Sequence, residues 1–252
     1  MTALVRAELL KLRTVRLPFW LLVTTLLLVG LSVAATVFGA GVEGSPLQLE
    51  DPDLLARSAA SASGGNLLLI VLGILMLTQE FRFGTATPSF LTTPKRGRVV
   101  VAKLLAVSIT GALFAALSVL LALGLSYAFI ALRDGEARFD ATVLEVLAGV
   151  FLVLALYGPI GVGVGALVRN QIAAVVITLA WVFILEQILV ALVPEVGRWT
   201  PGGGTAAVLQ LGDLATTRGD LLPVWGGALL LLAYAAVFSV AGALVTLRRD
   251  LT

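Results

Sequence analysis

The sequence predicts an all-α integral membrane protein with six transmembrane helices and both termini in the cytoplasm. Of its 252 residues, 59% are hydrophobic and only 13% are charged, and the mean hydropathy is +1.06. Soluble domains carry about 25% charged residues, so this composition is typical of a polytopic membrane protein. The apolar residues gather in six runs that are long enough to cross a bilayer. Lysine and arginine gather between alternate runs, which indicates an orientation.

The chain begins with a segment, residues 2–16, that predicts a helix lying on the cytoplasmic leaflet. Val5, Leu9 and Leu12 share one side of this helix, and basic residues are spread over much of the rest. Such a basic side would meet anionic lipid. The alternative is a frayed basic tail.

A single transmembrane domain, 1–252, contains all six predicted spans. They cover about 17–38, 64–79, 99–132, 143–168, 172–193 and 224–247. The second span is short, so we expect it to thin the bilayer locally or to recruit neighbouring helices. The third is longer than a bilayer needs, so we expect it to tilt or to extend into the cytoplasm.

Between the second and third spans lies a basic island, residues 78–103. It has six charged residues, which are Glu80, Arg82, Lys95, Arg96, Arg98 and Lys103. Within it, Thr85–Leu91 predicts a short helix on the cytoplasmic surface. The basic residues could serve topology alone, but topology gives no reason for Phe90 and Leu91 among threonines and prolines. Apolar side chains on a short surface helix suit a socket in a partner protein.

The segment between the fifth and sixth spans, residues 194–223, is not strongly polar. It begins with the breaker cluster PEVGRWTPGGG and continues with the mildly apolar TAAVLQLGDLATT. A solvated loop does not need so much Ala, Val and Leu. The pattern predicts short helices that re-enter the outer leaflet and pack against protein.

The charges support a cytoplasmic N-terminus. With that orientation, 12 of the 17 lysines and arginines lie on the cytoplasmic side, whereas most of the 15 acidic residues lie outside or at the outer boundary. The basic residues carry the inference because acidic residues contribute little to topology.

The sequence predicts no catalytic, cofactor or metal site of its own. It has no cysteine and no histidine, which excludes disulfides and thiol chemistry and removes the commonest general base. A glycine-rich phosphate-binding loop followed by Lys-Ser or Lys-Thr is also missing.

Three residues inside the spans are candidates for a transport pathway or for structural roles. Glu186 is the only carboxylate clearly inside a span, toward the outer leaflet, and an ionisable group there is costly to bury. Hydrogen bonding to a neighbouring helix is favoured over a substrate or ion role for it. Gly158 and Pro159 lie in the glycine-rich fourth span, where helix packing is favoured over gating.

Four stretches resemble one family: AELLKLRTVR at the start, EFRFGTATPSFLTTPKRGRVVVAKL after the second span, GALVRNQIAAVVITLAW after the fourth, and WTPGGGTAAV before the last. With these, the chain resembles the six-span permeases of type-2 ABC exporters over nearly its whole length. The resemblance implies a coupling helix that docks in a groove of a separate ATPase subunit. The ATPase-coupling residues that it implies are Glu80, Arg82, Gly84, Thr85, Pro88, Phe90, Leu91, Pro94, Lys95 and Arg96.

The resemblance further implies ATP-driven export of a hydrophobic or amphipathic substrate such as a drug, a peptide antibiotic or a lipid. ATP and Mg would bind to the partner ATPase and not to this chain. The other partners would be a second permease copy or a paralogue, and membrane lipid, with no nucleic acid. The expected location is the plasma membrane of a bacterium.

Two other classes remain open. An ion-gradient-driven transporter or channel would be expected to have several intramembrane ionisable residues, and the sequence offers essentially Glu186. A non-transporting sensor or assembly protein would use the basic island to recruit a cytoplasmic partner other than an ATPase. A membrane enzyme ranks behind both.

Overall fold

The computed structural model describes residues 1–43, 45, 47–82, 96–168, 170–212 and 220–248. Within these residues the secondary structure is entirely helical, with no strand. The first half contains α1 (Thr2–Thr14), α2 (Leu17–Gly39), α3 (Leu54–Ala60), the 3₁₀ turn η1 (Ser61–Gly65), α4 (Asn66–Arg82) and α6 (Arg96–Leu132). The second half contains α7 (Ala141–Val168), α8 (Gln171–Ala180), the π-helical turn η2 (Trp181–Leu185), α9 (Glu186–Leu192), α10 (Pro194–Gly197), α11 (Pro201–Val208) and α12 (Val224–Arg248).

Six helical segments in the described part of the chain are long and apolar enough to cross a membrane. They are Leu17–Gly39, Leu54–Glu80, Gly97–Leu132, Ala141–Val168, Gln171–Leu192 and Val224–Leu244. The prediction of six apolar spanning helices is therefore confirmed, and the chain has the makeup of a multi-pass membrane protein.

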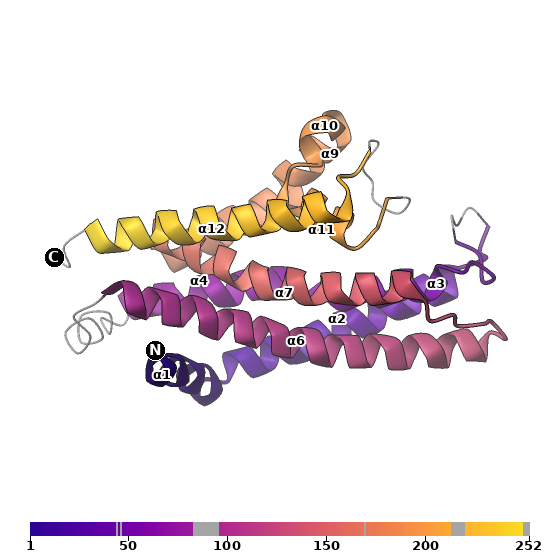
Figure 1. The fold of residues 1–252 in the computed structure, drawn as a ribbon, viewed down its shortest axis with the longest axis horizontal. Coiled ribbons are helices and arrows are strands. Elements are labelled where there is room, and N and C mark those ends of the chain that lie inside the picture. Colours follow the sequence, from indigo (N-terminus) through magenta and orange to yellow (C-terminus); the bar gives the residue numbers. More distant parts are fainter. Residues whose placement is uncertain (44, 46, 83–95, 169, 213–219, 249–252) are drawn as a thin grey trace.

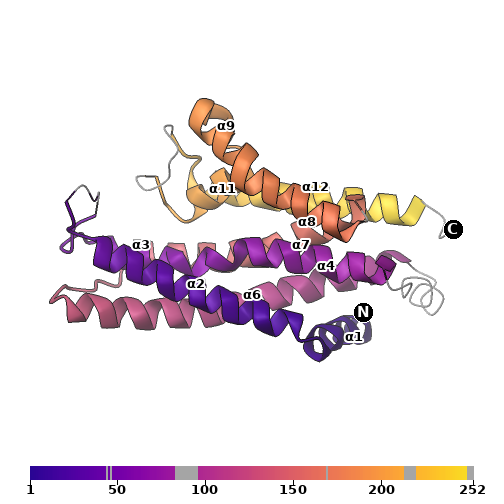
Figure 2. The ribbon, with the colours of Figure 1, turned by 180° about the vertical axis from the view of Figure 1, so that it is seen from behind.

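The long helices run side by side as a bundle (Figures 1 and 2). The central helix is α7, which contacts α3, α4, α6, α8, α11 and α12 and is buried over most of its length. The helices α2 and α6 pack together on one side of it, and α12 packs on the other. This arrangement explains why α7 carries the glycine-rich sequence: neighbours surround it and approach closely.

Glycines let the helices around α7 come into backbone contact. A Cβ on Gly161 would meet the carbonyl oxygen of Ile70 in α4, and a Cβ on Gly73 in α4 would meet the carbonyl oxygen of Gly158. On the other side of α7, a Cβ on Gly163 would meet the backbone of Phe238 in α12. Packing is thus what these glycines do in the structure, and Pro159 lies buried among them inside a continuous helix.

The helix that contains the second predicted span begins earlier than 64–79. Its spanning segment covers Leu54–Glu80, because η1 joins α3 to α4 without a break. The sequence SASGG has the composition of a loop, but its small residues let it pack against α2. A Cβ on Gly65 would collide with Thr25, and the Ser61 hydroxyl lies 3.1 Å from that of Ser32. The span is therefore not short, and no local thinning of the bilayer is required by its length.

The N-terminal segment is a helix, α1, which lies across one end of the bundle with its axis turned away from the long helices (Figure 1). Leu9 and Leu12 pack against the core, and Val5 is half-buried on the same side, as the sequence predicts. The end of α4, the start of α6 and the end of α12 lie at the same end of the bundle as α1 (Figure 1).

Between the fifth and sixth spans, two short helices, α10 and α11, occupy part of residues 194–223. Helix α11 lies against both α7 and α12. Its first residue, Pro201, accepts a 3.2 Å hydrogen bond through its carbonyl from Tyr157, the seventeenth residue of α7. At a rise of about 1.5 Å per residue, Tyr157 lies about 24 Å along α7 from Ala141.

Candidate functional site

Four charged side chains form a network at the end of the bundle where α1 crosses it. The ammonium of Lys103 in α6 lies 2.8 Å from Glu8 Oε2 in α1 and 2.9 Å from Glu80 Oε1 in α4. Lys11, also in α1, reaches the same two carboxylates, at 2.7 Å from Glu8 Oε1 and 2.9 Å from Glu80 Oε1. We call Glu8, Lys11, Glu80 and Lys103 the inner ion cluster. It joins three helices that are far apart in the sequence.

The inner ion cluster is largely removed from solvent. The Lys103 side chain is 2% exposed, Glu8 is 6% and Glu80 is 12%, whereas Lys11 is half exposed at the rim. A charge that is buried in this way is tolerated only when it is paired and hydrogen-bonded. Two ammonium and two carboxylate groups balance each other, and the carbonyl of Met76, 3.5 Å from Lys103 Nζ, adds an oxygen.

The cluster changes the titration of Glu8 and Lys11. Burial alone would raise the pKa of the Glu8 carboxyl, but the charge and hydrogen bond of Lys103, together with those of Lys11, outweigh burial and hold the pKa below its ordinary value. Burial alone would lower the pKa of the Lys11 ammonium, and the bonds to Glu8 and Glu80 outweigh it, so this pKa is raised. Both groups are therefore stabilised in their charged forms.

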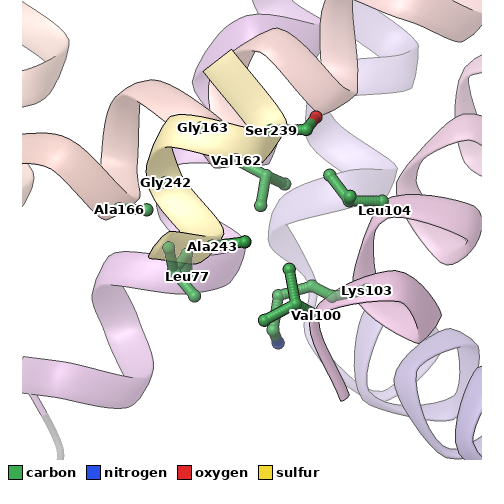
Figure 3. Close-up of a pocket in the computed structure, with 10 residues that line it drawn as sticks. All are labelled: Leu77, Val100, Lys103, Leu104, Val162, Gly163, Ala166, Ser239, Gly242 and Ala243. Atoms are coloured by element: carbon green, nitrogen blue, oxygen red, sulfur yellow. The ribbon is translucent and has the colours of Figure 1, made fainter. Parts of the chain in front are cut away.

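The stem of Lys103 connects the cluster to the helices on the other side of the bundle. It lines a void of about 10 Å³, room for about one water, together with residues of α4, α7 and α12 that include Leu77, Gly163 and Gly242. In Figure 3 the Lys103 nitrogen points away from Gly163 and Ser239, out of this void. Thus the methylenes pack against the bundle while the charge faces α1 and α4.

The structure describes only three of the predicted ATPase-coupling residues. Glu80 lies in the inner ion cluster, Arg82 is the exposed last residue of α4, and Arg96 is the first residue of α6. The other predicted coupling residues lie outside the described residues; they are Gly84, Thr85, Pro88, Phe90, Leu91, Pro94 and Lys95. The helix predicted at Thr85–Leu91 therefore stays a prediction.

Sequence reasoning missed Glu8 and counted Lys103 only among the basic residues of the island. A signal for both was present. Lys103 stands in the apolar run VVVAKLLAV, where a charge needs a partner, and Glu8 is the only acidic residue in the basic first segment. Nothing in the sequence pairs them, because 95 positions separate the two residues.

The second candidate region is a cavity of about 530 Å³ beside α8, η2 and α9. Its opposite wall consists of residues from α4, α7, α11 and α12. Glu186, the one carboxylate predicted inside a span, is the first residue of α9; it lines the cavity and is 5% exposed. Its Oε1 accepts a 2.6 Å hydrogen bond from the backbone amide of Gly202 at the start of α11. Hydrogen bonding to a neighbouring element, the favoured expectation for Glu186, is therefore what the structure contains, and the carboxylate faces a cavity as well.

A π-helical turn directly precedes Glu186. A π turn adds one residue to a helical turn and is frequent at functional sites. Here it covers Trp181–Leu185, and the Gln187 amide donates a 3.2 Å hydrogen bond to the carbonyl of Val182 within it. Trp181 and Glu186, at the two ends of the turn, both line the cavity.

Tyr157 of α7 lines the cavity and is hydrogen-bonded to α11. Its hydroxyl lies 2.7 Å from the Thr205 hydroxyl and also donates to the Pro201 carbonyl, both in α11. Thr200 caps α11 by accepting from the Gly203 amide at 3.1 Å. Helix α11 therefore presents the Gly202 amide to Glu186, and the Pro201 carbonyl and the Thr205 hydroxyl to Tyr157.

Comparison of the chain with protein-family models gives no match, and comparison with curated proteins gives no significant match.

Proposed function

We propose that this chain is the membrane-spanning subunit of an ATP-driven exporter, working as a dimer of permeases with a separate ATPase subunit in the cytoplasm. The substrate would be hydrophobic or amphipathic, and the location would be the plasma membrane of a bacterium. The proposal is supported by the six apolar spans and by the resemblance of the segment around residues 80–103 to the coupling segment of type-2 ABC permeases.

The inner ion cluster is the observation that carries the proposal. Helices α4 and α6 are the two that enter and leave segment 83–95, and Lys103 ties both of them to α1 through Glu80 and Glu8. Separating such a pair would leave a buried charge without its partner, at a cost of about 3–5 kcal/mol. A force applied to segment 83–95 from the cytoplasm would therefore move α1, α4 and α6 together.

The route from such a force to the cavity runs through α7. Helix α4 is in backbone contact with α7 at Gly73 and Gly161, and α7 carries Tyr157 in the cavity wall. Displacement of α4 relative to α7 would change the space between α7 and the α8–α9 segment. ATP binding by the partner could in this way open and close a path for substrate.

Substituting Phe90 and Leu91 by aspartate tests the proposal. We expect the Phe90→Asp/Leu91→Asp variant to reach the membrane but to lose its ATPase subunit during purification in mild detergent, because aspartate cannot fill an apolar socket. The matched control is Leu10→Asp, on the exposed side of α1, which should keep the ATPase. If the double variant retains both the ATPase and ATP-driven transport, the docking assignment is wrong.

A second candidate is a transporter driven by an ion gradient, and the observation that favours it is the position of Glu186 in a cavity wall. A single buried carboxylate that gains and loses a proton could drive transport. Flux into vesicles separates the two candidates. The exporter requires ATP and tolerates an uncoupler, whereas the gradient-driven transporter needs no ATP and stops when the proton gradient is collapsed.

A further inference from the structure

The cavity beside α8, η2 and α9 has the size and lining of a small-molecule site. Its volume of about 530 Å³ falls within the roughly 300–1,000 Å³ of known ligand sites. Most of its wall is aliphatic, from residues such as Leu67, Ile160 and Val164. A ligand with a hydrophobic body would bury apolar surface against this wall.

Four aromatic rings and one carboxylate also line the cavity, together with the polar side chains of Asn66, Thr178 and Gln187. Tyr157, Trp181, Tyr234 and Phe238 all line the cavity, and the last two rings stack at 6.4 Å between centroids. The faces of such rings carry partial negative charge and attract cations. Glu186 lies in the same wall.

The charge of Glu186 has no cationic side chain to balance it within the part of the chain that the structure describes. Among the residues that the structure describes, the cavity lining includes no lysine or arginine, and the ion pairs found there do not include Glu186. The Gly202 amide supplies a single hydrogen bond. A buried carboxylate that lacks a counter-charge is costly, and a bound cation would remove that cost.

We propose that this cavity binds an amphipathic organic cation, with the positive charge beside Glu186 and the hydrophobic body against the rings and aliphatic side chains. The inference deepens the proposed function, since it names the substrate class of the exporter. An anion would be repelled by Glu186, and a neutral molecule would leave the carboxylate unpaired. Charge and hydrophobicity are both required of the ligand.

Binding of tetraphenylphosphonium to the purified chain in lipid nanodiscs tests the proposal without an ATPase. This probe is permanently charged and hydrophobic, and triphenylphosphine oxide is a neutral probe of similar build. Equilibrium dialysis should detect one saturable site per chain for the cation. We expect Glu186→Gln to weaken binding of the cation by about tenfold or more and to leave binding of the neutral probe unchanged.

Two further variants control for loss of folding and for general surface charge. Glu186→Asp keeps the charge and should retain affinity within about threefold, whereas Glu195→Gln removes an exposed carboxylate on α10, outside the cavity, and should change nothing. If Glu186→Gln binds the cation as the unmodified chain does, if Glu186→Asp is as weak as Glu186→Gln, or if the neutral probe binds as tightly as the cation, the proposal is wrong.

Combined with purification of the chain from its native membrane, the binding experiment separates this inference from the exporter proposal. Cation binding that depends on Glu186, in a chain that purifies from its native membrane without an ATPase, would support the site and contradict the exporter. An associated ATPase together with no Glu186-dependent cation binding would do the reverse.

Discussion

At the scale of single residues, Lys103 is the most deeply buried charged residue in the described part of the chain. It is 2% exposed, and its ammonium is held by carboxylates of α1 and α4. Glu8, Glu80 and Lys103 are largely buried, and each of these charges is tolerated only while its partners remain. Replacing one of the three should therefore cost more stability than replacing all three together.

The first prediction concerns removal of the Lys103 charge. Lys103→Met leaves Glu8 and Glu80 close together and facing only Lys11, so it should destabilise the folded chain by about 3–5 kcal/mol. Thermal unfolding in detergent measures the loss. The control Arg98→Met, at an exposed position five residues earlier in α6, should change stability by less than about 0.5 kcal/mol. A triple variant, Glu8→Leu/Glu80→Leu/Lys103→Met, should recover most of the loss, and failure to recover it would contradict charge burial as the cause.

The second prediction concerns pH. Because the pKa of Glu8 is lowered on folding, its contribution to stability is present above the unfolded value of 4.5 and is lost as the pH falls through the lower folded value. Because the pKa of Lys11 is raised, its contribution is present below 10.5 and is lost as the pH rises through the higher folded value. The unmodified chain should lose Tm more steeply than Glu8→Gln between about pH 5 and about pH 3. Parallel acid limbs would mean that Glu8 is not held as a paired carboxylate.

At the scale of helices, the packing around α7 depends on backbone contact. Gly161→Ala would drive a Cβ into the Ile70 carbonyl of α4, whose carbon would lie 2.8 Å away, so α4 and α7 must separate. We expect a loss of about 1–3 kcal/mol in thermal unfolding. The control is Gly124→Ala in α6, where a Cβ would meet nothing within 4 Å and should change stability by less than about 1 kcal/mol. Equal stability of the two variants would contradict the close contact.

The sequence predicts the spanning helices well because a long apolar run has few other stable structures in a membrane. Starts and interruptions are harder to predict. The stretch SASGG continues a helix because it packs on α2, and that contact is invisible in the chain itself. The π-helical turn at Trp181–Leu185 is likewise not predicted by the sequence, so the side that Trp181 and Glu186 face cannot be derived from the sequence alone.

The same distinction applies to the candidate site, where isolated charges are visible in the sequence but their partners are not. Glu186 and Lys103 stand out in the sequence because each is an isolated charge inside an apolar run. Their partners do not, because Gly202 contributes only a backbone amide and Glu8 is distant in sequence from Lys103. Long-range pairs of this kind require the fold.

At the scale of the whole molecule, the predicted orientation in the membrane rests on the basic segments and can be tested directly. The chain has no cysteine, so single cysteines can be introduced without a background. Glu136→Cys, in the exposed link between α6 and α7, should react with a membrane-impermeant maleimide on intact cells. Arg13→Cys, on the exposed side of α1, should react only after permeabilisation. The reverse pattern would place α1 and the inner ion cluster outside the cell.

Whether the bundle acts as an exporter subunit depends on its cytoplasmic partner. The inner ion cluster and the cavity lie on opposite sides of the α4–α7 contact, an arrangement suited to passing a movement from one to the other. That movement needs an energy source which the chain is not expected to supply.

The most direct test of the exporter proposal is purification of the tagged chain from its native membrane in mild detergent, with identification of co-purifying proteins and an assay of ATP hydrolysis. We predict a stoichiometric ATPase subunit that is lost when Thr85–Leu91 is scrambled. A chain that purifies alone under these gentle conditions, with no ATP hydrolysis, would contradict the proposal.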